Sequence, residues 1–168
     1  MFDELVLGVD PGVASFGLAL VGGPRNRPRI EWARTASTPS GSPASERLLR
    51  VHREVLAALR EARPSALAVE RLLWGRNTGS AMEVSRASGA ILVAAALEGV
   101  PVEEYAPLEV KMAVTGVGNA SKEQVRRSLT RVLGLEGVPQ EPDAADAVAI
   151  AVCHLQQSGL RRLQRAAQ

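Results

Sequence analysis

Cysteine is nearly absent from this 168-residue chain, because Cys153 is the only one. A single cysteine excludes an internal disulfide and any zinc site built from several cysteines. Aromatic residues make up only 3% of the sequence, which argues against a platform of rings that stacks single-stranded bases. The longest wholly apolar run, at 90–97, is much shorter than the roughly twenty residues that span a bilayer. No basic segment followed by an apolar run stands near the start, so we expect a soluble protein of the cytoplasm.

The length fits one compact domain, since a domain usually holds about 100–200 residues. Short apolar runs bounded by turn residues predict strands at 4–10, 15–22, 28–36, 66–70 and 101–105. Apolar residues at helical spacing predict helices at 45–62, 77–98, 107–114, 121–133 and 143–157. Strands first, then strands alternating with helices, predict an α/β domain with a mixed sheet.

The predicted helix at 77–98 has little polar surface in its second half, where alanines surround Ile91. A helix that is apolar all round is buried on more than one side. Two interpretations stay open: a central core helix, or a core helix that also supplies a dimer interface.

Lysine is almost as scarce as cysteine, and arginine carries most of the positive charge. The net charge is +2, from 20 basic and 18 acidic residues, and Lys111 and Lys122 are the only lysines. The basic residues concentrate at 25–34, 109–131 and 159–168. Basic patches are expected where a protein binds phosphate, although solvated arginine-rich faces explain the same pattern.

The chain has only four aspartates, and three of them occupy unusual positions together with one glutamate. Asp10 and Glu70 each follow an apolar strand, at the carboxyl end where open α/β sheets bind ligands. Asp143 and Asp146 stand three residues apart at the start of a helix, so their side chains share one face. Taken alone, Asp143 is explained as a helix N-cap, Asp10 as a turn aspartate and Glu70 as a surface charge.

Taken together, the four carboxylates predict a cation site. Carboxylates that converge on one sheet edge repel and raise one another's pKa unless cations neutralise them. Oxygen ligands of this kind suit Mg²⁺ or Mn²⁺, and two such ions can activate a water for phosphodiester hydrolysis. The histidines do not compete as catalytic groups, because His154 lies about 16 Å along the helix from Asp143 and His52 lies in mid-helix.

Several segments match one known family in order and spacing. They are Leu7-Gly-Val-Asp10-Pro-Gly12 with Gly17-Leu18, then Ala68-Val-Glu70, then Val110-Lys111 with the glycine-rich stretch to Val125, and the helix from Asp143-Ala-Ala-Asp146 to His154. Through these segments the chain resembles the RuvC-type Holliday junction resolvases, which have a ribonuclease H-like fold. The first motif alone is weak, because actin-like ATPases and sugar kinases share it. The segment at 110–125, with its two lysines and its glycines, and the helix that begins Asp143-Ala-Ala-Asp146 are together specific for this family.

The resemblance implies a role for each matching residue. Asp10, Glu70, Asp143 and Asp146 would bind two Mg²⁺ or Mn²⁺ ions per subunit, and Lys111 and Lys122 would contact DNA near the site. The family acts in recombination and repair as a homodimer that resolves a four-way DNA junction by paired symmetric nicks. Its members work with a branch-migration motor of the RuvA and RuvB type. We accordingly expect a ribonuclease H-like nuclease domain at 1–158, with a five-stranded mixed sheet, and a basic C-terminal tail at 159–168.

The chain departs from the family pattern in the loop after Glu70, where the family often has an aromatic wedge three residues on. Leu73 stands there with Trp74 beside it, and either could enter the junction, or Trp74 could pack on the domain surface. Arg76 is a candidate phosphate contact. Two other functions stay open: a ribosomal RNA-processing nuclease of the same fold, and a junction-binding module without turnover. An actin-like ATPase or sugar kinase needs two such domains and is excluded by length.

Overall fold

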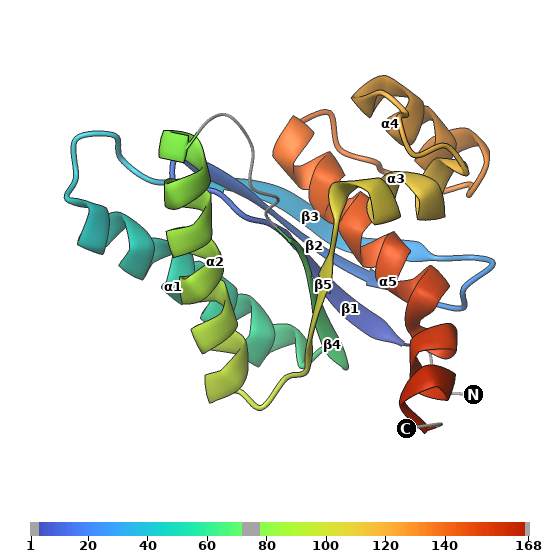
Figure 1. Ribbon diagram of the computed structural model, residues 1–168, viewed down its shortest axis with the longest axis horizontal. Helices are drawn as coiled ribbons and strands as arrows, with labels where there is room; N and C mark the ends of the chain where they lie inside the picture. Colours follow the sequence, from blue (N-terminus) through green and yellow to red (C-terminus); the bar gives the residue numbers. More distant parts are fainter. Residues whose placement is uncertain (1–3, 72–77, 167–168) are drawn as a thin grey trace.

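The computed structural model describes residues 4–71 and 78–166, which form one central sheet with helices on both faces (Figure 1). The strands are β1 (Leu5–Asp10), β2 (Ser15–Gly22), β3 (Arg29–Ser37), β4 (Ala66–Glu70) and β5 (Val102–Tyr105). Their order in the sheet is β3-β2-β1-β4-β5. The pairs β1–β2 and β2–β3 are antiparallel, whereas β1–β4 and β4–β5 are parallel. The predicted five-stranded mixed sheet is therefore confirmed.

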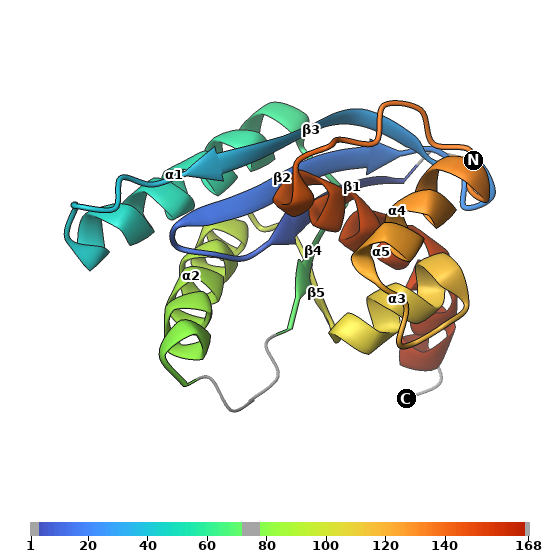
Figure 2. The same cartoon turned by 90° about the horizontal axis from the view of Figure 1, so that it is seen from above.

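Helices lie on both faces of this sheet, as Figures 1 and 2 show. The helices are α1 (Ala44–Ala62), α2 (Thr78–Leu97), α3 (Pro107–Thr115), α4 (Lys122–Arg131) and α5 (Pro142–Ala166). Helices α1 and α2 pack on one side, and α5 with α3 and α4 on the other. The sheet thus separates two hydrophobic cores.

The alternation of side chains along each strand decides which core a residue joins. On β1, Val6 packs in the core under α5, and Leu7 and Val9 pack in the core under α1 and α2. On β4, Ala68 faces α5 while Leu67 and Val69 face the other way. Because side chains alternate, Asp10 and Glu70 belong to the α5 face of the sheet.

Two helix ends test the predicted boundaries. Helix α4 begins as expected after Ser121, whose hydroxyl accepts a hydrogen bond from the backbone N–H of Gln124, while the Gln124 side chain accepts one from the Ser121 backbone N–H. This reciprocal pair is a capping box. Helix α5 was expected to end near Gln157, and this was wrong, because it continues to Ala166. Most of the expected tail at 159–168 is therefore helical.

Helix α2 is buried on one side only in the single chain, which contradicts the interpretation as a central core helix and leaves open the interpretation as a core helix that also supplies a dimer interface. Ala87, Ile91 and Ala94 are fully buried, but Met82, Val93 and Leu97 are more than half exposed. By length and composition alone, residues 79–97 would be apolar enough to cross a membrane. A core helix of a soluble protein meets the same criterion.

Candidate active site

Two of the four predicted carboxylates stand at the ends of neighbouring parallel strands. β1 ends at Asp10 and β4 ends at Glu70, and the two strands are paired in register from Val6 and Ala66 onward. Parallel strands end at the same edge of a sheet, so both acids lie at one edge and on the α5 face. This is the edge at which the sequence predicted a cation site.

The other two carboxylates come from the first turns of α5, which lies unusually close to the sheet. Added at Gly8 on β1, a Cβ atom would collide with the carbonyl oxygen of Ala147. At Gly17 on β2, which pairs with Asp10, it would collide with the carbonyl of Asp143. The two glycines therefore let α5 rest against the strands and deliver Asp143 and Asp146 beside Asp10.

Asp143 is not the N-cap of this helix, although the sequence allowed that alternative. Helix α5 begins at Pro142, and the backbone N–H of Ala145 donates to the carbonyl of Glu141. Asp143 is therefore inside the first turn. A negative charge there is favoured by the helix dipole, and its side chain remains available for other partners.

Each of the two α5 carboxylates is bound by a side chain from another element. The ammonium Nζ of Lys122, at the start of α4, lies 2.6 Å from Asp146 Oδ2. The hydroxyl of Ser15, at the start of β2, donates to Asp143 Oδ2 at 2.5 Å. Lys122 was predicted to belong to the site, but Ser15 was missed. The available signal was its position two residues before Gly17 on β2, because alternate residues of a strand share a face and Ser15 therefore lies on the α5 face.

The electrostatics of the site are those of crowded carboxylates. Burial, reinforced by the charges of Asp146, Glu70 and Asp143, raises the pKa of the Asp10 carboxyl from 3.8 to about 8, against the opposing effect of Lys122. Burial and Asp146 also raise the pKa of Glu70, which Lys122 and Lys111 lower. The hydrogen bond to Asp146 raises the pKa of Lys122. The site thus resists full ionisation unless more positive charge is supplied.

The donor set fits a hard divalent cation in its chemistry. Carboxylate oxygens are the ligands that Mg²⁺ and Mn²⁺ prefer, and the pKa of Asp10 is raised by burial and also by the charges of three neighbouring carboxylates. Within residues 4–71 and 78–166, no group of three acidic, histidine or cysteine side chains is gathered closely enough to hold an ion as it stands. Ion binding would therefore require the carboxylates to turn toward one another.

Of the remaining predicted DNA contacts, the structure describes Lys111 but not the three residues of the loop after Glu70. Lys111 on α3 is half-buried and acts on the charge of Glu70, so both lysines stand within electrostatic reach of the acids. Leu73, Trp74 and Arg76 lie outside the described residues. Their roles remain predictions from the sequence.

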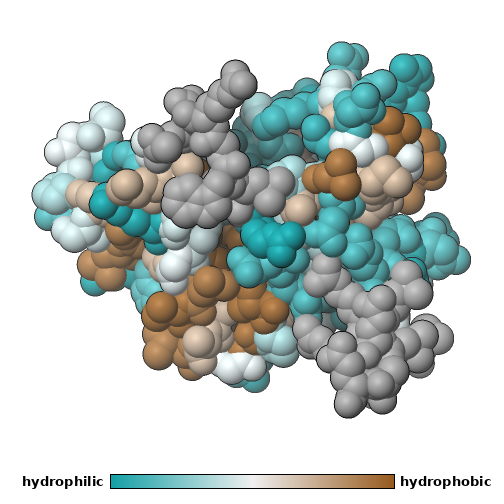
Figure 3. All heavy atoms as spheres, in the orientation of Figure 1, coloured by the Kyte–Doolittle hydropathy of each residue, from teal (hydrophilic) through white to brown (hydrophobic). Residues whose placement is uncertain are grey.

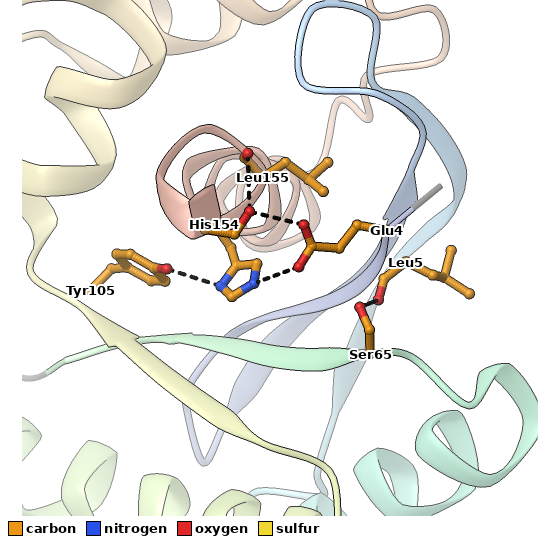
Figure 4. A network of polar contacts seen from close by, with 7 residues as sticks. Glu4, Leu5, Ser65, Tyr105, His154 and Leu155 are labelled. Carbon is orange, nitrogen blue, oxygen red and sulfur yellow. Dashed lines mark hydrogen bonds and ion pairs between the residues drawn. The ribbon is translucent and has the colours of Figure 1, made fainter. Parts of the chain in front are cut away.

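Both histidines have structural surroundings away from the acids. His154 is 4% exposed, and its ring nitrogens face the Tyr105 hydroxyl at 2.9 Å and a Glu4 carboxylate oxygen at 3.4 Å (Figure 4). Ser158 donates to the other oxygen of Glu4. His52 on α1 lies 3.1 Å from the carbonyl oxygen of Ala90 on α2. The exclusion of the histidines from the acidic site is therefore consistent with their positions.

The first part of the basic segment at 25–34, in the β2–β3 turn, lies at the far end of the sheet from Asp10, whereas β3 then runs back toward Asp10 and Arg34 pairs with Leu18. The β2–β3 turn adjoins Gly22, which pairs with Leu5 at the start of β1, whereas Asp10 ends that strand. Three of its arginines also bind within the chain: Arg25 to the backbone of Gln156, Arg29 to Glu31 and Arg34 to Glu54. The solvated-face interpretation therefore suits this segment better than phosphate binding at the acidic site.

Comparison with known proteins decides the family. The family model described as crossover junction endodeoxyribonuclease RuvC matches residues 6–154. The chain belongs to the RuvC family. The RuvC of Desulfitobacterium hafniense is 44% identical over 151 residues, which cover 89% of this chain and 91% of that protein. The RuvC of Thermotoga petrophila is 41% identical over 158 residues, which cover 94% and 96%.

Solved structures agree with the RuvC assignment. Thermus thermophilus RuvC in complex with a Holliday junction substrate superimposes with a TM-score of 0.87 at 38% identity, covering 94% of this chain and 96% of that one. A yeast mitochondrial Holliday junction resolvase shares the fold, with a TM-score of 0.71 at 13% identity over 95% and 81%. The expected ribonuclease H-like fold and the resemblance to RuvC are both confirmed. RuvC-type nucleases depend on a divalent metal.

Proposed function

We propose that this RuvC-family chain resolves four-way DNA junctions, with Asp10, Glu70, Asp143 and Asp146 as the ligands of two Mg²⁺ or Mn²⁺ ions. The observation that carries the proposal is the convergence of these acids on one face and edge of the sheet, where burial, reinforced by the neighbouring carboxylates, raises the pKa of Asp10 to about 8. A cluster with that surplus of negative charge is stabilised by the ions that the reaction needs. The bound ions would activate a water and stabilise the departing oxygen at the scissile phosphate.

The chain's own residues divide the remaining work. Two strands and the first turns of α5 carry the four carboxylates, so the proposed ligands stand on rigid elements rather than on loops. Lys111 and Lys122 supply positive charge beside the acids for the DNA backbone. Lysine grips phosphate without identifying a base, which suits an enzyme that selects DNA structure.

A homodimer is the second part of the proposal, with α2 as the contact. Met82, Val93 and Leu97 of α2 are exposed, and apolar surface gathers over this helix in the space-filling view (Figure 3). Soluble monomers rarely expose a large contiguous apolar patch, so a partner surface is expected there. A second copy fits best, because two identical acidic sites are what paired, symmetric nicks require.

Two further features rest on the family resemblance. They are cooperation with a branch-migration motor of the RuvA and RuvB type, and a place in the cytoplasm. The division into a nuclease domain at 1–158 and a basic end at 159–168 remains a proposal of the same kind.

The decisive experiment incubates the purified protein with a labelled synthetic four-way junction in Mg²⁺, Mn²⁺ or EDTA. Linear duplex and structured RNA serve as controls. Paired, symmetric nicks that appear only in the junction and only with metal support the proposal. Cleavage of RNA alone would favour the processing nuclease, and tight binding without any cut would favour the binding module.

A matched variant assigns the chemistry to the acidic cluster. Asp146→Asn removes a carboxylate charge while keeping the size of the side chain, so cleavage should be lost and junction binding retained. Glu136→Gln, an exposed acid outside the cluster, is the control and should cleave normally. Robust cleavage by Asp146→Asn would refute the assigned role.

A further inference from the structure

Ser15 links the first strand hairpin to the first turn of α5 through a single short hydrogen bond. Its hydroxyl donates to Asp143 Oδ2 at 2.5 Å, across 128 residues of sequence. Bonds from a hydroxyl to an ionised carboxylate are short and about twice as strong as neutral ones. A bond of this type restricts the rotation of the Asp143 carboxylate.

The backbone that carries Ser15 is itself fixed. The hydroxyl of Thr38 donates to the carbonyl of Val13 at 2.6 Å, and the Thr38 backbone N–H donates to the carbonyl of Ala14 at 3.0 Å. Arg47 of α1 donates in turn to the Thr38 hydroxyl at 2.8 Å. The turn from Asp10 to Ser15 is therefore braced from β3 and α1.

The close approach of α5 brings the two partners together. Ser15 and Gly17 are two residues apart on β2, so both face α5. Only a residue without a Cβ fits at Gly17, against the Asp143 carbonyl, and this lets the Asp143 side chain come within reach of the Ser15 hydroxyl. The contact thus depends on the same packing that assembles the acidic cluster.

We propose that Ser15 is a positioning residue for Asp143: its hydroxyl holds Oδ2 and so orients the carboxylate for cation binding. The inference rests on the proposed function, in which Asp143 is an ion ligand. Partners of this kind commonly change metal affinity by about 10–100-fold when they are removed. Ser15 acts through Asp143 and does not itself touch the substrate.

The test measures Mn²⁺ affinity of the full-length, metal-free protein by titration followed with electron paramagnetic resonance. Ser15→Ala should weaken Mn²⁺ binding by about 10-fold or more, and Ser15→Thr, which keeps the hydroxyl, should restore it. Ser37→Ala is the matched control, because Ser37 is exposed and pairs directly with Ser15 across β2 and β3. It should bind Mn²⁺ as the wild type does. An unchanged affinity in Ser15→Ala would overturn the inference.

A double-mutant cycle separates positioning from a general loss of structure. In an Asp143→Ala background, Ser15→Ala should weaken Mn²⁺ binding no further, because the carboxylate that it orients is gone. Equal, additive losses in the two backgrounds would also overturn the inference. If Asp143→Ala itself leaves Mn²⁺ affinity unchanged, the proposed function fails. If Asp143→Ala weakens Mn²⁺ binding but Ser15→Ala does not, the proposed function stands and the inference about Ser15 fails.

Discussion

The ammonium of Lys122 lies 2.6 Å from a carboxylate oxygen of Asp146, so a cation of the chain itself already occupies the acidic cluster. The Lys122 side chain is 75% exposed and the Asp146 side chain 29%, which leaves the lysine free to swing away. In the proposed site, a metal ion bound by Asp146 would compete with Lys122 for the negative charge of this carboxylate. We expect a lysine displaced in this way to be available to a DNA phosphate.

The first prediction follows from this competition. Lys122→Gln should bind Mn²⁺ more tightly than the wild type, by at most about fivefold, since exposed ion pairs are worth up to about 1 kcal/mol. The same variant should cleave the junction about 100-fold more slowly, because a positive charge beside the scissile phosphate is lost. Mn²⁺ titration and single-turnover cleavage measure the two effects. Weaker Mn²⁺ binding by this variant would contradict the competition.

Lys111→Gln provides the comparison for that experiment. Lys111 acts on the charge of Glu70 but makes no hydrogen bond to Asp146 among the contacts found in the described residues. Its removal should slow cleavage while changing Mn²⁺ affinity less than Lys122→Gln does.

The raised pKa of Asp10 predicts an inverse dependence of stability on pH in the absence of metal. Because this pKa is about 8 in the folded protein and 3.8 ordinarily, the folded state holds a proton that the unfolded chain has released between these values. The free energy of unfolding should therefore fall as pH rises from about 4 to about 8. The raised pKa of Glu70 acts in the same direction. Urea unfolding in EDTA across this range measures the effect.

Asp10→Asn tests whether the dependence comes from this carboxyl. The variant should be more stable than the wild type at pH 8 in EDTA, and it should not cleave. Addition of Mn²⁺ should flatten the pH dependence of the wild type, because the ion stabilises the charged carboxylates. If Asp10→Asn keeps the full wild-type dependence, another group is responsible.

The close contact at Gly8 allows a test of how strongly the acidic site depends on the packing of α5 against the sheet. A Cβ at this position would collide with the Ala147 carbonyl and lie 2.9 Å from Ala151 Cβ. Gly8→Ala should therefore cost about 1–3 kcal/mol of stability through overpacking. It should also reduce cleavage, because α5 carries Asp143 and Asp146. Gly41→Ala, where the added carbon meets open space, should match the wild type in urea unfolding and in cleavage. Equal stability of the two variants would contradict the close packing.

The strands and the four acids were predictable because their signals are local. An apolar run that ends in Asp10 or Glu70 specifies both a buried strand and a charge at its end, and parallel pairing then brings the two ends together. For Ser15 the only signal is its position two residues before Gly17 on the same face of β2, which does not by itself indicate a functional residue. It is an exposed serine at a strand start, and it acquires a role only because Gly17 lets a helix 128 residues away approach it.

The end of α5 is a second feature that the sequence did not predict. The helix was predicted to end near Gln157, where the continuous apolar stretch has given way to polar residues, but it continues to Ala166. In the structure, contacts from distant segments hold the next turn: Gln156 exchanges hydrogen bonds with Arg25, and Ser158 bonds to Glu4. The number of arginines at 25–34 likewise did not indicate a phosphate partner. Several of these arginines bind groups within the chain instead.

The exposed apolar face of α2 carries the last prediction. Val93 is 54% exposed and Leu97 65%, and both lie away from the core that Ile91 and Ala94 join. A charge at Val93 meets solvent in a single chain but is buried without a partner in a dimer built on this face. Val93→Asp should therefore fold normally and sediment as a monomer at micromolar concentration, where we expect the wild type to sediment as a dimer.

The consequence for activity separates dimerisation from the chemistry of each site. A monomeric Val93→Asp retains all four carboxylates, so it should bind Mn²⁺ as the wild type does but lose paired, symmetric nicking of the junction. Val132→Asp is the matched control, because Val132 is 76% exposed and follows α4 on the other side of the sheet. It should remain dimeric and make paired nicks. A dimeric Val93→Asp would place the contact between subunits on a different face, and the apolar surface of α2 would then require another partner.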